Sequence, residues 1–205
     1  HEDCRRQRQM CIRDSYSTVR TQNAIFNCNV ALVLIDAEKG FGKQDKTIVD
    51  QVISKGKALI FIVNKWDKIE KSTSTMKEFK EEIRLQYKEL DHFPILFISS
   101  TTKQRVNKVL ETAWSVYERS KKIIPTNKLN VLIEKAMNDN PPPAEKGKVI
   151  KINYCVQVHK QPAVIALFTN YPKLIKVSYQ RFLMNQIRSN FDLKGIPIRL
   201  SFRKK

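Results

Sequence analysis

The sequence predicts an α/β protein in which a doubly wound parallel sheet precedes a smaller α+β sandwich. Three observations predict it. Short continuous apolar segments alternate with longer segments whose apolar residues recur every three or four positions, which is typical of buried parallel strands joined by helices. After residue 122 the regular alternation of expected strands and helices changes. From there a single helix precedes an alternating strand and its expected partner strand, as in a small sandwich.

Three strands and three helices are expected between Ser15 and about Lys122. The strands are VALVLIDA (30–37), ALIFIVN (58–64) and PILFISS (94–100). The helices are KQDKTIVDQVISKG (43–56), TSTMKEFKEEIRLQYKEL (73–90) and QRVNKVLETAWSVYERSKK (104–122). The first helix should end at Gly56, because glycine tolerates the backbone conformation that follows a helix C-terminus. The apolar face of the third helix comprises Val106, Val109, Leu110, Ala113, Val116 and Tyr117.

The second unit should contain two helices and three strands in the order α, β, β, α, β. Pro125 ends the preceding helix, and Thr126 can cap the next one. The further elements are strands 149–158 and 163–169, a helix at 178–191 capped by Ser178, and a strand at 196–202. Alternation in the first of these strands predicts that its apolar residues share one face. They are Ile150, Ile152, Tyr154, Val156 and Val158.

Composition excludes several classes of protein. Of 205 residues, 41% are hydrophobic and 28% charged, which is typical of a globular chain that can bury a core. The longest apolar segments, 31–35 and 58–63, are far shorter than a bilayer-spanning helix, and no signal-peptide core follows the N-terminus. We therefore expect a cytoplasmic protein with no membrane partner. The four cysteines and three histidines show no metal-ligand spacing, so no metal site is expected.

Positive charge is the strongest compositional signal. Lysine and arginine number 38 against 20 acidic residues, a net charge of +18. Residues 145–205 hold 13 of the cations and only two acids, a net of 13 − 2 = +11. Such an excess favours a polyanionic partner, because each neutralised phosphate releases counterions. The alternative is that the charge serves solubility alone.

Polar residues follow two of the expected strands at the point where each strand ends. Asn64, Lys65 and Asp67 follow the second strand, and Ser99 and Ser100 end the third. In open α/β sheets ligands bind at the carboxyl ends of the strands. A carboxylate can accept bonds from both N1–H and the 2-amino group of guanine, whereas adenine offers no matching pair of donors. The five residues therefore predict a guanine-binding site, with backbone N–H groups of the serine turn bonding O6 and the Lys65 stem along the ring.

These residues resemble the base-recognition loops N-K-x-D and S-A-x of translation-factor-like GTPases. Trp66 within NKWD, the segment YSTVRTQNAI (16–25), and the C-terminal segments PPPAEKGK, NYP and GIPIRLSFRKK narrow the resemblance to the Der (EngA) family. Members of that family are bacterial GTPases with two tandem G domains that act in assembly of the large ribosomal subunit. The resemblance implies part of a P-loop-NTPase-like G domain at 15–122 and a KH-like domain at 123–205. Residues 1–14 remain an unassigned tail, disordered or foreign to the rest.

The sequence departs from the family pattern where phosphates and metal are held. No G-x-x-x-x-G-K-[ST] segment is present. Asp192 and Gly195 fit the D-x-x-G pattern, but they lie between the last expected helix and strand of the basic C-terminal unit, where a turn is expected. Ser100 stands where the family usually carries alanine, a change that keeps the backbone donor. We therefore expect a fragment that begins within or after the second switch region, with no catalytic residues. GTP or GDP would be held weakly by its guanine part, and Mg²⁺ would bind only in the complete protein.

The resemblance also implies ribosomal RNA and the precursor of the large ribosomal subunit as partners. A KH-type G-x-x-G loop is absent, so ordinary single-strand recognition is not expected. Candidate phosphate contacts are Lys146, Lys148, Lys151, Arg188, Arg199, Arg203, Lys204 and Lys205. Each one alone is more simply a solvated surface charge. Phe168, Tyr171 and Phe182 could stack on bases, although core packing is the more common role of aromatics at such spacing.

Two functions from different classes fit these observations. One is a GTP-binding protein of ribosome biogenesis, present as a fragment without its phosphate-binding loop. The alternative is a stand-alone basic RNA-binding module with no nucleotide chemistry, in which the α/β unit serves as a scaffold. A GTPase regulator fits less well. The oligomeric state stays open.

Overall fold

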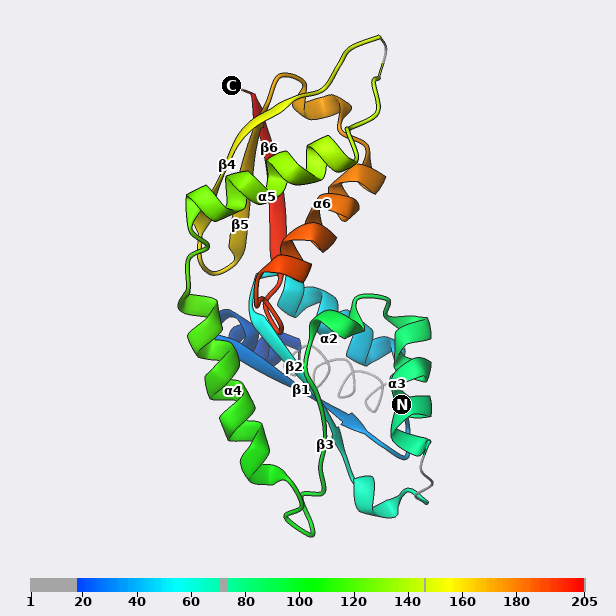
Figure 1. The fold of residues 1–205 in the computed structure, drawn as a ribbon. Coiled ribbons are helices and arrows are strands. Elements are labelled where there is room, and N and C mark those ends of the chain that lie inside the picture. Colours follow the sequence, from blue (N-terminus) through cyan, green and yellow to red (C-terminus); the bar gives the residue numbers. More distant parts are fainter. Residues whose placement is uncertain (1–17, 71–73, 146, 205) are drawn as a thin grey trace, which may run out of the picture.

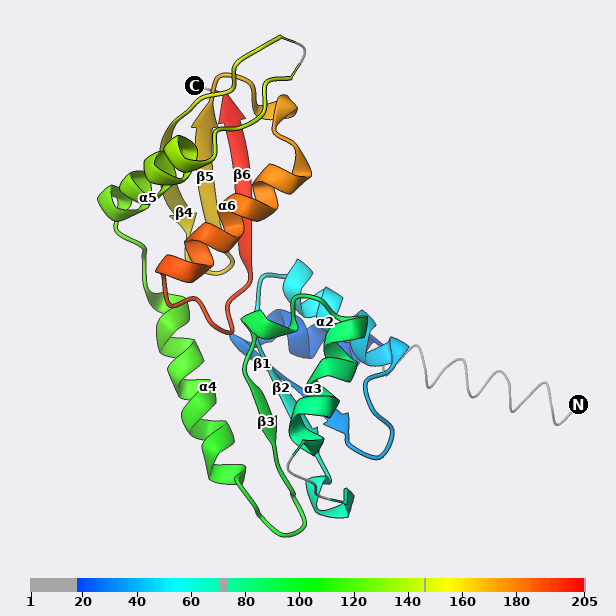
Figure 2. The same cartoon turned by 45° about the vertical axis from the view of Figure 1, so that its right-hand side comes forward.

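Two sheets, each with its own helices, organise an elongated molecule (Figures 1 and 2). The structure, a computed structural model, describes residues 18–70, 74–145 and 147–204. The tail expected at residues 1–14, and the candidate cations Lys146 and Lys205, lie outside this range. We use "N-terminal lobe" for residues 18–121 and "C-terminal lobe" for residues 124–204. No helix within the described ranges is long and apolar enough to cross a membrane.

The sheet of the N-terminal lobe is parallel throughout, in the order β1-β2-β3. Its strands are β1 (Val30–Asp36), β2 (Ala58–Asn64) and β3 (Ile95–Phe97). Helices α2 (Lys43–Ser54) and α3 (Thr75–Gln86) lie on one face, and α4 (Val106–Lys121) lies on the other (Figure 1). Parallel pairing brings the carboxyl ends of β1 and β2 side by side, with Asp36 opposite Asn64. The predicted doubly wound architecture is confirmed.

Strand β2 is buried on both faces, which explains its unbroken apolar sequence. Phe61 and Val63 pack with α2 and α3 on one face, in a cluster that includes Phe41 and Phe93. Ile60 and Ile62 pack against α4 on the other face. All four of these β2 side chains are at most 2% exposed. Full burial of such a side chain contributes roughly 1.5–3 kcal/mol, so β2 is a rigid support for whatever its ends carry.

Strand β1 is an edge strand with a partly uncovered face. Val33 and Ile35 are buried, whereas Leu32 and Leu34 on the other face are 39% and 57% exposed. Leu110, which helical spacing placed on the apolar face of α4, is 70% exposed. Among the described residues no strand pairs with the outer edge of β1. The sheet therefore ends before it can cover the full width of the apolar face of α4.

The C-terminal lobe has the predicted order of elements. They are α5 (Thr126–Asp139), β4 (Ile152–His159), β5 (Ala163–Thr169), α6 (Val177–Asn190) and β6 (Ile198–Lys204). β4 pairs with β5 in antiparallel fashion, and β5 pairs with β6 in parallel. Both helices lie on the same face of this sheet (Figure 2) and bury Ile165 and Leu167 of β5 against Leu183 and Ile187 of α6. The expected α+β sandwich is confirmed.

The predicted alternation of β4 is wrong in its detail. The pairing of β4 with β5 shifts between Ile152 and Tyr154. Ile152 and Cys155 are both buried, whereas Tyr154 is 46% exposed. An extra residue in one strand of a pair reverses which later side chains face the core. Capping also differs, since the residues before α5 and α6 are Pro125 and Lys176 rather than Thr126 and Ser178.

The lobes are joined at the amino end of β2. The backbone of Gly195 donates to the His92 carbonyl (2.8 Å) and accepts from the Leu59 N–H (2.9 Å). The guanidinium of Arg199 donates to the Ser54 carbonyl at the end of α2. Since Leu59 lies near the start of β2, the strand that carries the candidate site at one end is bonded to the C-terminal lobe at the other.

Candidate functional site at the strand ends

The structure brings the predicted loops after β2 and β3 together. The backbone N–H of Ser100 donates to Asn64 Oδ1 (3.1 Å), and the Ser100 hydroxyl donates to the same oxygen (2.8 Å). A single amide side chain therefore joins residues that lie 36 positions apart in the chain. These bonds fix the two loops relative to each other.

The loop after β3 is closed by its own polar groups. Ser99 is fully buried, its N–H donates to the Gln104 carbonyl (3.2 Å), and its hydroxyl accepts from the Thr102 N–H (3.1 Å). Lys103 and Arg105 adopt left-handed conformations, with φ of 58° and 60°. A side chain larger than serine at position 99 would meet the packed core. The turn therefore presents Ser100 in a defined place.

A buried tryptophan anchors the loop after β2. The Trp66 side chain is 3% exposed, and its ring centroid lies 4.4 Å from that of Phe97 and 5.7 Å from that of Phe79. The backbone N–H of Trp66 donates to the Ile98 carbonyl (3.1 Å). Lys65, just before it, adopts a left-handed conformation with φ of 62°. Because Trp66 is held in the core, its neighbours Lys65 and Asp67 stay at the edge of the sheet.

Lys65 bonds to an acid that the sequence analysis missed. Its Nζ lies 2.6 Å from Asp36 Oδ2 and 3.4 Å from Glu38 Oε2. The hydrogen bond from Lys65 lowers the pKa of Asp36, and the same bond raises the pKa of Lys65. The signal was available, because Asp36 ends β1 as Asn64 ends β2, and parallel strands end at one edge. The ion pair holds the lysine head at β1, so its stem runs between the two strand ends.

The arrangement fits a flat ligand with hydrogen-bond donors on one edge. The exposed Asp67 carboxylate can accept two such bonds, and the Lys65 stem offers an apolar surface for a ring. The Ser100 amide already donates to Asn64, so a bond to a ligand carbonyl would come from another N–H of the same turn. The part of the chain that is described contains no group of three or more His, Cys, Asp or Glu side chains arranged to hold a metal.

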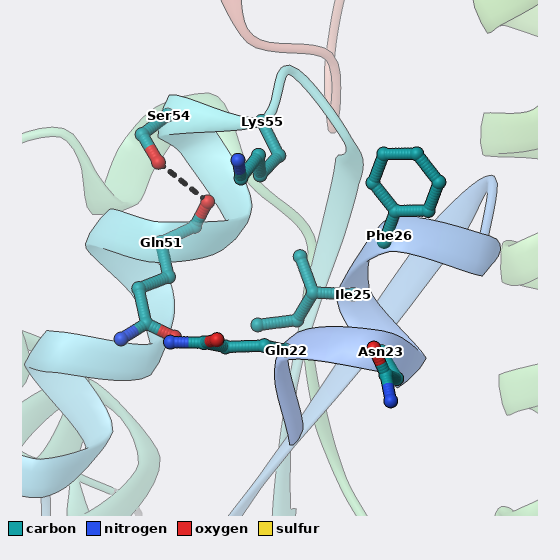
Figure 3. Close-up of a pocket in the computed structure, with 7 residues that line it drawn as sticks. All are labelled: Gln22, Asn23, Ile25, Phe26, Gln51, Ser54 and Lys55. Carbon is teal, nitrogen blue, oxygen red and sulfur yellow. Dashed lines mark hydrogen bonds between the residues drawn. The ribbon is translucent and has the colours of Figure 1, made fainter. Parts of the chain in front are cut away.

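A separate pocket lies at the opposite end of the sheet. Its volume is about 340 Å³, and it lies between the helix at residues 18–27 and the end of α2 (Figure 3). The lining residues are Gln22, Asn23, Ile25, Phe26, Gln51, Ser54 and Lys55. None of the predicted site residues lines this pocket, because α2 ends beside the start of β2 rather than its carboxyl end.

The candidate cations of the C-terminal lobe are dispersed. Lys148 lies with its Nζ 4.9 Å from the Tyr171 ring centroid, and Lys151, Arg203 and Lys204 are exposed. Arg188 is partly buried between the lobes, where burial lowers its pKa to about 10. Arg199 is bonded to α2, as described above. Arg199 therefore joins the lobes, whereas Arg188 donates to the Ile196 carbonyl of its own lobe (3.2 Å).

The three candidate stacking aromatics also separate in the structure. Tyr171 and Phe182 pack against the core of the C-terminal lobe. Phe168 instead pairs with Tyr154, with ring centroids 6.1 Å apart. The core role that spacing favoured therefore holds for two of the three.

Comparison with known proteins gives a consistent assignment. Residues 16–119 match the family described as the elongation factor Tu GTP binding domain. Residues 124–203 match the family described as the KH-domain-like region of EngA bacterial GTPase enzymes, C-terminal. A crystal structure of Era in complex with MgGDPNP and nucleotides 1506–1542 of 16S ribosomal RNA is 20% identical, with a TM-score of 0.40 over 90% of this chain and 67% of that one. That likeness is too weak to bear on function.

Curated relatives cover nearly all of the chain. GTPase Der of Desulforamulus reducens is 47% identical over 192 residues, and that of Caldanaerobacter subterraneus subsp. tengcongensis is 43% identical over 192 residues. Each alignment covers 94% of this chain and 44% of the relative. GTPase Der of Christiangramia forsetii is 43% identical over 190 residues, or 93% and 44% of the two chains. The chain thus spans less than half the length of these relatives, and it belongs to the Der (EngA) family of GTPases.

Proposed function

We propose that the ends of β2 and β3 recognise the guanine base of GTP or GDP. One observation carries the proposal: Asn64 Oδ1 accepts two bonds from Ser100, at 3.1 and 2.8 Å. These bonds bring Lys65, Asp67 and the serine turn to one edge of the sheet. Membership of a GTPase family is consistent with this role.

Each residue has a defined task in this proposal. The Asp67 carboxylate accepts bonds from N1–H and the 2-amino group of guanine, and the serine turn donates a backbone N–H to O6. The stem of Lys65 lies along the ring, while its ion pair with Asp36 (2.6 Å) holds the side chain extended. Adenine lacks the 2-amino group and places an acceptor at N1. Adenine therefore supplies neither of the two donors that guanine offers to the Asp67 carboxylate, which should disfavour adenine strongly.

The proposal is limited to the base. No G-x-x-x-x-G-K-[ST] segment occurs in the chain, so the amides and lysine that hold phosphates in P-loop proteins have no counterpart here. The base alone should bind with a dissociation constant on the order of 1 mM, about 4 kcal/mol. We assign Mg²⁺ binding and GTP hydrolysis to the longer members of the family.

Titration of a fluorescent GDP analogue into the chain tests this function. Binding should be saturable, displaced by GTP and not by ATP, and lost in Asp67→Asn. In that variant the amide can donate to the 2-oxo group of xanthine while still accepting from N1–H. Xanthosine diphosphate should therefore bind Asp67→Asn better than the original chain. Equal displacement by ATP and GTP, or unchanged binding in a folded Asp67→Asn, would refute base recognition.

A second function, RNA binding, is favoured by the charge of the C-terminal lobe. The two acids of residues 145–205 are both engaged in ion pairs, Glu145 with Lys176 (2.9 Å) and Asp192 with Arg119 (2.7 Å). We propose that the remaining cations contact RNA phosphates, including Lys148, Lys151 and Lys204. The family resemblance extends this to ribosomal RNA, the precursor of the large ribosomal subunit and a cytoplasmic location.

The two functions fall on separate parts of the chain in this proposal. Helix α4 ends at Lys121 and α5 begins at Thr126, so we place the boundary between a G-domain part at 15–122 and a KH-like domain at 123–205. If RNA binds with strong salt dependence while guanine nucleotides do not bind at all, the stand-alone RNA-binding module becomes the better description.

A further inference from the structure

We infer that the open face of the C-terminal sheet binds single-stranded RNA by stacking bases on Tyr154, Phe168 and Arg203. The inference rests on the RNA-binding part of the proposed function and adds the site and the form of RNA. It differs from a simple phosphate contact, because it uses flat side chains on a sheet rather than dispersed lysines.

The face is defined by the pairing of the strands. Tyr154 of β4 lies opposite Phe168 of β5, and Phe168 lies opposite Arg203 of β6. Cross-strand partners point to the same side of a sheet, so these three side chains form one row across it. Helices α5 and α6 cover the other face, where Ile165 and Leu167 are buried (Figures 1 and 2).

This row is open to solvent at its two ends, Tyr154 and Arg203, while Phe168 between them is partly exposed. Tyr154 is 46% exposed, and its ring lies 6.1 Å from that of Phe168 at an interplanar angle of 38°. The next row holds Val156, Ala166 and Ser201, of which Ala166 is fully buried, so the accessible part of the face is the row of Tyr154, Phe168 and Arg203. The register shift after Ile152 is what turns Tyr154 outward.

Charge selects the partner for this face. None of the three strands contains an aspartate or a glutamate. Arg203 and Lys204 are exposed at the end of β6, and Arg203 Nε donates to Ser201 Oγ (3.4 Å), which directs the guanidinium over the sheet. Aromatic rings beside cations, with no acid among them, complement bases joined by phosphates. An apolar protein surface would leave these cations unpaired.

Stacking also selects single strands. The bases of an RNA duplex are stacked on one another and cannot reach side chains on a sheet, whereas unpaired bases can splay out and stack on aromatic rings and arginine planes. This recognition tolerates any sequence, because every base has a flat face. It also needs no G-x-x-G loop, which the chain lacks.

Fluorescence anisotropy with the whole chain and a labelled 12-nucleotide oligouridine tests the inference. Tyr154→Thr keeps a strand-forming residue but removes the ring, and it should weaken binding about ten-fold. Tyr154→Phe should bind like the original chain. Arg203→Lys, which keeps the charge but loses the plane, should bind several-fold more weakly. Arg181→Gln, which removes a cation from the exposed side of α6, should change affinity less than two-fold.

Each outcome decides between the possibilities. The stacking face would be overturned if folded Tyr154→Thr bound oligouridine as tightly as the original chain does. It would also be overturned if a duplex of equal length bound more tightly than oligouridine. In both cases the proposal of RNA binding would remain. Absence of any RNA binding would refute both the stacking face and the proposed RNA binding of the C-terminal lobe. If Tyr154→Thr instead abolishes self-association in sedimentation without affecting RNA, the face pairs with a second copy and the inference is wrong. Should the variant unfold, ultraviolet cross-linking of the original chain must still place oligouridine on β4 or β5.

Discussion

The two lobes both rest on a three-stranded sheet, but they present their polar groups in different places. In the N-terminal lobe helices cover both faces, and the candidate site is confined to the strand ends at Asn64, Lys65 and Asp67. In the C-terminal lobe helices cover one face, and aromatic and cationic side chains occupy the other. Strand ends can aim a few directional bonds at one ligand. An open face can only offer area and charge, which suits a long flexible polymer.

The lobes also differ in what they leave uncovered. The edge strand β1 exposes Leu32 and Leu34, and α4 on the same face exposes Leu110 and Trp114. On the C-terminal sheet, by contrast, the uncovered face carries Arg203 beside its aromatic pair. Exposed apolar edges favour packing with more protein, whereas exposed aromatics with cations favour nucleic acid.

The largest expected effect is loss of the aromatic core beneath β2. Phe61 is fully buried, with its ring centroid within 6.2 Å of those of Phe41, Tyr87 and Phe93. Phe61→Ala should lower the free energy of unfolding by about 3–5 kcal/mol, measured by urea denaturation. Leu34→Ala, at a 57% exposed position of the same lobe, should cost less than about 1 kcal/mol. Equal losses of unfolding free energy in the two variants would mean that the N-terminal core is not organised around β2.

The next largest effect should come from the contact between the lobes. Gly56 has φ of +70°, and a Cβ there would lie 2.2 Å from Pro162 of the C-terminal lobe. Gly56→Ala should therefore destabilise the chain by about 2–4 kcal/mol, from backbone strain plus overpacking. Gly147 has the same φ but no atom within 4 Å of such a Cβ, so Gly147→Ala should cost only about 1 kcal/mol. Similar unfolding curves for the two variants would show that the lobes do not meet at Pro162.

Removal of the link between the two site loops should have a smaller effect on stability than on binding. Asn64→Ala deletes the acceptor of both Ser100 bonds and should cost about 1 kcal/mol of stability. Guanosine affinity should fall about ten-fold, because the loops lose their relative position. Ser100→Ala keeps the backbone donor and should bind guanosine almost normally. An Asn64→Ala variant with unchanged affinity would separate Asn64 from the site.

The smallest effect should be the pH dependence of the Lys65–Asp36 pair. Because the folded-state pKa of Asp36 is lowered by Lys65, its contribution to stability is present above the unfolded pKa of about 3.9 and is lost as pH falls through the folded value. The raised pKa of Lys65 gives a contribution that is present below about 10.4 and is lost as pH rises further. Both groups are partly exposed, so salt should weaken the effect. A folded-state pKa of Asp36 at or above about 3.9, measured by NMR, would contradict the ion pair.

Sequence patterns predicted most of the fold because its strongest elements are regular. Strand β2 matches its expected range, and the order of elements in both lobes follows from apolar periodicity. The register shift in β4 could not be predicted, since a bulge depends on the partner strand rather than on alternation within one segment. The exposure of Leu110 was missed for a similar reason. Helical spacing defines an apolar face, but the width of the sheet beneath it decides how much is covered.

The candidate site was predictable in part. Asn64, Lys65, Asp67, Ser99 and Ser100 were expected from their place after apolar strands, and the structure brings their loops together. Asp36 and Glu38 were overlooked because the end of β1, where Asp36 is the last residue, carried no recognised motif. The buried packing of Trp66 against Phe79 and Phe97 also required the fold, since no spacing rule connects residues from a loop, a helix and a strand.

The most direct test of base recognition omits phosphates altogether. Two-dimensional ¹H–¹⁵N NMR spectra of the chain should be recorded during titration with guanosine and, separately, with adenosine. Guanosine should shift the amide signals of residues 64–67 and 99–102 in a saturable manner, and adenosine should leave them in place. Equal shifts with both nucleosides, or guanosine shifts confined to other parts of the chain, would contradict a guanine site at the ends of β2 and β3.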